Sequence, residues 1–118
     1  MRKIIFYKTL SKKSPIEDFL DSLSGKQAQK VAWVLRLIEE LDHIPSNYLK
    51  NLINTDGILE IRVQLGRDIF RLLGFQYAKN YIVLTNGFQK KTQKTPKQEI
   101  KLAERRKREY LKRRKKNG

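Results

Sequence analysis

The sequence contains no cysteine and only one histidine among its 118 residues. Without cysteine there are no disulfide cross-links or thiolate metal sites, and one histidine cannot form a histidine-based zinc site within one chain. No apolar run approaches the roughly 20 residues that a membrane-spanning helix needs, and no signal-peptide-like segment follows Met1. We therefore expect a soluble, cytoplasmic protein with no membrane partner and no metal or other cofactor.

What the sequence has in excess is positive charge. Lysine and arginine number 27 against 12 acidic residues, a formal net charge of +15. The excess is uneven, because residues 1–88 hold 13 basic and 9 acidic side chains (net +4), whereas residues 89–118 hold 14 and 3 (net +11). Such a block indicates either a solvated tail or a surface for a nucleic-acid partner, since a dense field of one sign attracts polyanions.

The length suits one domain, residues 1–118, with one hydrophobic core. Residues 3–7 are β-branched and aromatic, which predicts a short strand. Capping sequences beginning at Ser14 and Ser24 predict two antiparallel helices joined by a tight turn. The second helix should end near His43, because Pro45 disfavours helical backbone just before it.

From residue 58 onward the apolar residues alternate with polar ones, which is typical of half-buried strands. We expect strands over 58–65, 68–75 and 81–85, with Gly66-Arg67 as the first turn. A third capping sequence at Thr95 predicts a basic C-terminal helix and tail over 97–118, docked by its first turns with its basic end projecting. The predicted fold class is α+β: a small antiparallel sheet in the order β-α-α-β-β-β-α, with the helical hairpin on one face and the polar face open.

On the polar face, Glu60, Arg62 and Gln64 should project together, because side chains two apart on a strand share a face. The hairpin should place Arg71 of the next strand on the same side. One interpretation is cross-strand ion pairing with Glu60, worth about 0.2–1 kcal/mol. The other is a phosphate site, because two guanidinium groups on a rigid strand pair suit bidentate donation to phosphate.

A second signal follows the last strand, where residues 86–95 combine an aromatic side chain with three lysines. An exposed Phe88 would offer a stacking surface for a base, and Lys90, Lys91 and Lys94 would hold phosphates. The alternative is an ordinary lysine-rich loop with Phe88 in the core.

Three segments carry a resemblance to a known family: Glu60-Ile-Arg62, Ile69-Phe-Arg71-Leu-Leu, and Gly87-Phe-Gln-Lys90-Lys91-Thr-Gln-Lys-Thr-Pro96 running into Glu99-Ile and Ala103. The chain from its first strand to about Leu111 resembles the phage-derived, HigB-like branch of the RelE/ParE toxin superfamily. The resemblance implies a type II toxin–antitoxin toxin, most often an endonuclease that cuts mRNA in the ribosomal decoding site. It also implies a small cognate antitoxin as partner, commonly one with a helix-turn-helix DNA-binding domain.

Metal-independent RNA cleavage needs a base, an acid and cations around the phosphate. We assign Arg62 and Arg71 to the scissile phosphate and Lys90 and Lys91 to binding or proton transfer. The base is either Glu60 or a lysine whose pKa neighbouring cations lower. Further RNA-binding candidates are Arg67, Phe88, Gln93, Lys94 and Lys97.

Two other functions remain open from the sequence. Similar toxins often use histidine or tyrosine near the end of the last strand, where this chain has Phe88. A non-catalytic, basic RNA-binding module of the same fold is therefore one alternative. A ParE-like inhibitor of DNA gyrase is the other, since it would share the fold without needing the arginines and lysines.

Overall fold

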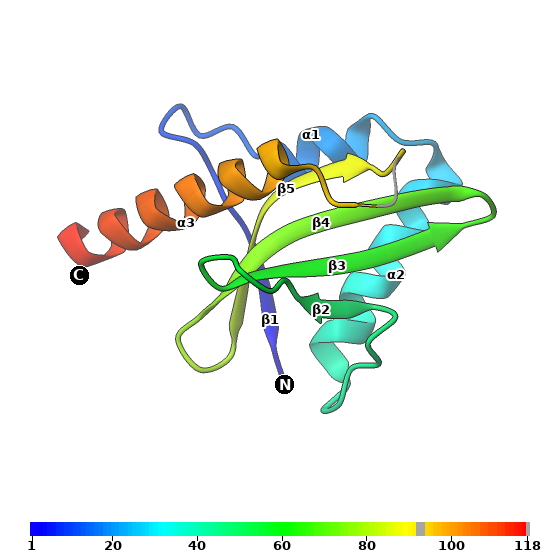
Figure 1. Ribbon diagram of the computed structural model, residues 1–118, viewed down its shortest axis with the longest axis horizontal. Helices are drawn as coiled ribbons and strands as arrows, with labels where there is room; N and C mark the ends of the chain where they lie inside the picture. The colour runs from blue at the N-terminus through cyan, green and yellow to red at the C-terminus, as the bar shows by residue number, and fades with distance from the viewer. Residues whose placement is uncertain (92–93, 118) are drawn as a thin grey trace.

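The computed structural model describes residues 1–91 and 94–117. Figure 1 shows one sheet with helices on both of its faces. The elements are, in chain order, β1 (Lys3–Phe6), α1 (Pro15–Asp21), α2 (Gly25–Glu40), β2 (Leu49–Asn51), β3 (Ile58–Leu65), β4 (Asp68–Tyr77), β5 (Tyr81–Gln89) and α3 (Lys97–Asn117).

The strands lie in the order β1-β5-β4-β3-β2. β1 runs parallel to β5, and the other neighbours are antiparallel. The predicted α+β class and the antiparallel pairing of the three strands from residue 58 onward are confirmed, but the sheet is not wholly antiparallel, because β1 is parallel to its neighbour. The predicted order lacked one strand, because β2 is only three residues long and its sequence Leu-Lys-Asn shows no apolar alternation. β5 also extends to Gln89, past the predicted end at Thr85.

The helical hairpin covers one face of the sheet, as the two capping sequences predicted. The Ser14 hydroxyl accepts the Glu17 backbone N–H, and Ser24 forms a full capping box with Gln27. α2 ends at Glu40, earlier than the predicted His43. The apolar sides of both helices and the sheet share the main core, formed by Ile16, Val31, Val34, Leu35, Ile38, Ile61, Val63, Phe70, Leu72, Ile82 and Leu84.

α3 lies on the opposite face, so the expectation that this face stays open is wrong where the helix packs on it. Ala103 packs with Ile58 and Leu73, and Tyr110 packs beside Phe75. The helix also does not dock by its first turns alone. Near its other end, the Tyr7 hydroxyl donates to Glu109 at 2.5 Å.

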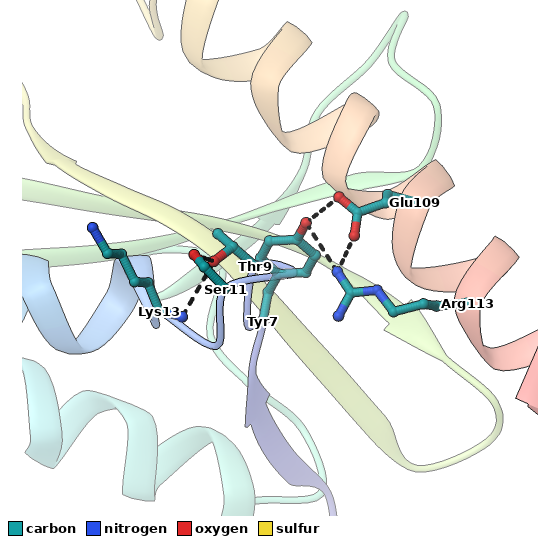
Figure 2. A network of polar contacts seen from close by, with 6 residues as sticks. All are labelled: Tyr7, Thr9, Ser11, Lys13, Glu109 and Arg113. Carbon is teal, nitrogen blue, oxygen red and sulfur yellow. Dashed lines mark hydrogen bonds and ion pairs between the residues drawn. The ribbon is translucent and has the colours of Figure 1, made fainter.

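We call Tyr7, Glu109 and Arg113 the Tyr7 cluster; Figure 2 shows it beside the loop that follows β1. Arg113 donates both to Glu109 and, at 3.3 Å, to the Tyr7 hydroxyl. The cluster fastens α3 to the end of β1, and the last turns of the helix extend beyond the sheet (Figure 1). The sequence concealed this part of the docking, because it depends on polar contacts between residues far apart in the chain.

Two glycines are needed where they stand. Gly66 has φ +61° in the β3–β4 turn, a conformation that glycine adopts without steric cost. At Gly87 a Cβ would come within 2.6 Å of the Phe19 ring, so α1 packs directly on the backbone of β5. Within the described residues, no helix is both long and apolar enough to cross a membrane.

Candidate functional site

A buried carboxylate on the same face of the sheet as α3 holds several polar side chains together. Glu60 is 1% exposed, and its Oε1 accepts from Nε of Arg62 at 3.1 Å. The same oxygen lies 3.5 Å from Nε of Arg71, while Oε2 accepts from the Thr95 hydroxyl. We call these four residues the Glu60 cluster.

The strand register explains why the two arginines meet. Arg62 of β3 lies directly opposite Arg71 of β4. Like charges at such a position repel, which destabilises the pair unless an anion lies between them. Glu60, two residues from Arg62 on the same face, supplies that anion. The sequence prediction that these three side chains converge is confirmed.

Arg71 is the more deeply buried of the two arginines. Its side chain is 11% exposed, and Nη1 donates to the Phe70 carbonyl at 3.2 Å. Its Nε is buried and forms no hydrogen bond in the structure. Burial lowers the pKa of Arg71, with Arg62 acting in the same direction and Glu60 opposing. The guanidinium nevertheless remains charged. Because its Nε–H has no acceptor among the described residues, Arg71 can still donate a hydrogen bond to a ligand.

Lys90 adds a further cation at the end of β5. Its backbone N–H donates to the Ile69 carbonyl at 2.7 Å, which fixes the residue beside β4. Loss of solvent lowers the pKa of Lys90, and so do Arg71, Arg62 and Lys50, with Glu60 opposing. Two guanidiniums contact a single carboxylate, and a third cation lies close enough to interact with all three groups, which leaves a local surplus of positive charge.

A hollow of about 320 Å³ gives access to the two arginines from outside. It follows the edge of β3 beyond Ile61, because β2 pairs only with residues 59–61. At its mouth the Tyr48 carbonyl accepts the Arg62 backbone N–H at 2.8 Å. The lining residues are Lys30, Asn47, Tyr48, Arg62, Val63, Gln64 and Arg71.

Phe88 lies opposite Arg71 in the β4–β5 register, but it is half-buried. Its ring packs against the cluster of Ile58, Leu73 and Ala103. The structure therefore favours the core interpretation of Phe88 over the exposed stacking surface.

The remaining predicted residues are more scattered. Lys91 directly follows Lys90 and is exposed, as is Lys94. Arg67 stands in the exposed β3–β4 turn, beyond the last strand pair. Lys97 lines a separate hollow with Asn54 and Glu104. The prediction for Gln93 lies outside the described residues.

Sequence reasoning missed the roles of several residues. Thr95 was expected to cap α3, yet its hydroxyl donates to Glu60. Lys30, Asn47 and Tyr48 come from α2 and the segment after it, and no sequence motif connects them with the arginines. Among the described residues, no group of three or more acidic, histidine or cysteine side chains is placed to hold a metal ion.

Fold and site together define a small, basic α+β protein in which a buried carboxylate holds a pair of arginines beside a surface hollow. Residues 18–108, more than half of the chain, match the family described as "Phage derived protein Gp49-like (DUF891)", and the chain belongs to this family. Membership is consistent with a toxin-like role. A search of curated proteins found no significant match.

Proposed function

We propose that the chain is the toxin of a type II toxin–antitoxin system, of the HigB-like RelE type, and that it cleaves mRNA on the ribosome without a metal ion. The observation that carries the proposal is the Glu60 cluster. It holds two guanidiniums in a fixed pair, with Lys90 beside them and a hollow leading to them.

The arrangement suits transesterification of an RNA phosphodiester. In that reaction the 2′-hydroxyl attacks phosphorus and the 5′-oxygen leaves, so negative charge grows on the non-bridging oxygens. Arg62 and Arg71 are placed to donate to those oxygens, and preorganised donors of this kind are worth about 10²–10³ in rate each. Donors held by a buried carboxylate need little reorganisation during the reaction.

Lys90 is our candidate for proton transfer. A lysine with a lowered pKa is neutral more often near pH 7 and is therefore a better base, while its protonated form is a better acid. Lys91, which is exposed, is assigned to phosphate binding. On the ribosome, positioning of the message would supply much of the remaining rate.

Glu60 is better described as a positioning residue than as the base considered above. Both of its oxygens are engaged, one by the arginines and the other by Thr95, and the side chain is 1% exposed. It acts on the phosphate only through the arginines that it holds.

The charge of the molecule also supports a protein partner. A cognate antitoxin of the helix-turn-helix type would neutralise the toxin by laying an acidic segment over this basic surface. The same positive charge would attract the phosphates of mRNA, with an affinity that falls steeply as the salt concentration rises.

One observation favours a second candidate function. Where similar toxins have histidine or tyrosine, Phe88 is half-buried and has no group that transfers protons. A non-catalytic RNA-binding module would need only the cations of the site.

The test is induced expression with mapping of RNA 5′ ends. The wild-type chain should arrest growth and produce new ends within translated codons. Arg71→Lys keeps the charge next to Glu60 but removes the planar guanidinium, which can donate two parallel hydrogen bonds to a phosphate. It should reduce cutting about 100-fold. Arg36→Lys, on an exposed position of α2, is the matched control and should cut like the wild type.

The outcomes separate the candidates. RNA that is bound in a salt-dependent manner but shows no new ends supports the non-catalytic module. Full cutting by a folded Arg71→Lys variant, with a wild-type circular dichroism spectrum, would remove Arg71 from the mechanism.

A further inference from the structure

The hollow that leads to the arginines has an aromatic side wall. Tyr48 lines it, and Trp33 of α2 meets Tyr48 edge to face, with ring centroids 6.1 Å apart at 71°. Trp33 is 48% exposed, and it is the only tryptophan of the chain. The ammonium of Lys30, which also lines the hollow, lies 4.6 Å from the Trp33 ring centroid.

We propose that Trp33, supported by Tyr48, binds a nucleobase of the RNA strand whose phosphate lies on Arg62 and Arg71. This inference rests on the proposed function, since it concerns the same substrate. It assigns a base subsite to residues of α2 and of the segment before β2. Phe88, the aromatic residue in the lysine-rich segment, does not provide such a surface because its ring packs into the core.

The size and chemistry of the hollow fit one nucleotide. Its volume of about 320 Å³ lies at the lower end of ligand sites, which span roughly 300–1,000 Å³. Arg62 and Arg71 line it with guanidiniums, which suit phosphate. Tyr48 lines it too, and the half-exposed Trp33 packs against Tyr48, so aromatic surface that suits a base adjoins the hollow. Lys30 lines the hollow beside Trp33 and could contact either the base or the next phosphate.

RNA fits this combination better than an acidic peptide does. Carboxylates would pair with Lys30, Arg62 and Arg71 but would gain nothing from a half-exposed tryptophan. A base gains from it, because each stacked base contributes about 10-fold or more to affinity. The acidic peptide is therefore the competing occupant that the experiment must distinguish.

Trp33 itself supplies the first measurement, since all tryptophan emission comes from it. The full chain is titrated with a short 2′-O-methyl oligoribonucleotide, which cannot be cut, and with an abasic oligomer of equal length and charge. Binding is followed separately by anisotropy of a terminal label. The base-bearing oligomer should quench Trp33 emission strongly, and the abasic oligomer should bind with little quenching.

The second measurement uses variants. Trp33→Ala should weaken binding of the base-bearing oligomer about 10-fold and leave the abasic oligomer unaffected, while Trp33→Phe should recover most of the loss. Tyr81→Ala is the matched control, because Tyr81 is a 38% exposed aromatic side chain at the β4–β5 turn. It should bind both oligomers like the wild type.

Each failure has a distinct meaning. If neither oligomer binds at low salt, the proposed function fails, and the inference fails with it. If both bind with equal affinity and Trp33 is not quenched, only the base subsite is refuted. Equal weakening of both oligomers by Trp33→Ala, or equally strong quenching by oligoglutamate, would likewise overturn it.

Discussion

The Glu60 cluster and the Tyr7 cluster use the same ingredients on the same side of the sheet. In each, one carboxylate accepts from a hydroxyl and from arginine. They differ in burial, because the side chain of Glu60 is 1% exposed and that of Glu109 is 38% exposed. They also differ in the elements that supply the arginines. The arginines on Glu60 come from two neighbouring strands, whereas Glu109 pairs with Arg113 one turn along the same helix.

The difference shows how one set of groups serves two purposes. In the Tyr7 cluster the guanidiniums of Arg106 and Arg113 lie over the Tyr7 ring, 5.6 and 5.3 Å from its centroid, and fasten the helix. In the Glu60 cluster the guanidiniums line a hollow and have another cation beside them. The arginines of the Tyr7 cluster are therefore engaged in packing the helix, whereas those of the Glu60 cluster remain reachable from a hollow.

The largest expected effect comes from removing each carboxylate in turn. Glu60→Ala leaves two opposed guanidiniums without their buried anion and should lower the free energy of unfolding by about 3 kcal/mol. Glu109→Ala breaks a partly exposed pair and should cost about 1 kcal/mol or less. Urea denaturation of both variants measures the difference, and equal losses would remove the distinction between the clusters.

Anion rescue sharpens the same comparison. Inorganic pyrophosphate should bind between the arginines of the Glu60→Ala variant and restore part of its stability by mass action. At the same concentration it should raise the melting temperature of Glu109→Ala less. A similar gain in both variants would indicate general screening instead of a site.

A smaller effect is expected for Tyr7→Phe. Burial raises the pKa of Tyr7 above its ordinary 10.0, and the hydrogen bond and charge of Glu109 act in the same direction. Because the pKa of Tyr7 is higher in the folded chain, the protonated hydroxyl stabilises the fold. This contribution to the free energy of unfolding is fully present below about pH 10 and is lost as the pH rises through the folded-state pKa. The variant should be about 1 kcal/mol less stable at pH 7.

Phenylalanine does not titrate, so above pH 10 the stability of Tyr7→Phe should fall less steeply than that of the wild type. Denaturation at a series of alkaline pH values checks this. Parallel pH curves for the two proteins would contradict the role assigned to the hydroxyl.

The smallest expected effect has the opposite sign. The pKa of Lys90 is lowered in the folded chain, so its protonated form destabilises the fold. This destabilisation is present below the folded-state pKa and is relieved as the pH rises through it. Lys90→Met should therefore raise the melting temperature at pH 7, on the order of 2 °C, while abolishing RNA cutting. Lys91→Met, the exposed neighbour, should not stabilise; an equal gain there would point to a general effect of net charge.

Much of the fold was predictable because its signals are local. Alternation over residues 58–65 and the caps at Ser14 and Ser24 each depend on a few neighbouring residues. The parallel partner of β1 was not predictable, since Lys3 pairs with Tyr81 far along the chain. The docking of α3 was underestimated for a related reason, because Tyr7 and Glu109 carry no shared sequence pattern.

The residues of the candidate site also fall into a group that local sequence patterns predict and a group that they do not. Glu60, Arg62 and Arg71 were predictable because a period of two and a tight turn set the register across one hairpin. The contact of Thr95 with Glu60 depends on how the chain returns from β5 toward α3. The wall formed by Lys30 and Tyr48 depends on the position of α2 against the sheet, which no local pattern specifies.

The pairing of β1 with β5 has a consequence for synthesis of the chain. β1 leaves the ribosome well before β5, with which it pairs, and Tyr7 has its hydrogen-bond partner 102 residues later. Contacts so distant in sequence form late and slow the folding of small proteins. A nascent chain therefore cannot pair β1 until β5 has been translated, or bond Tyr7 until α3 has, and until then β1 remains an unpaired strand open to other binders.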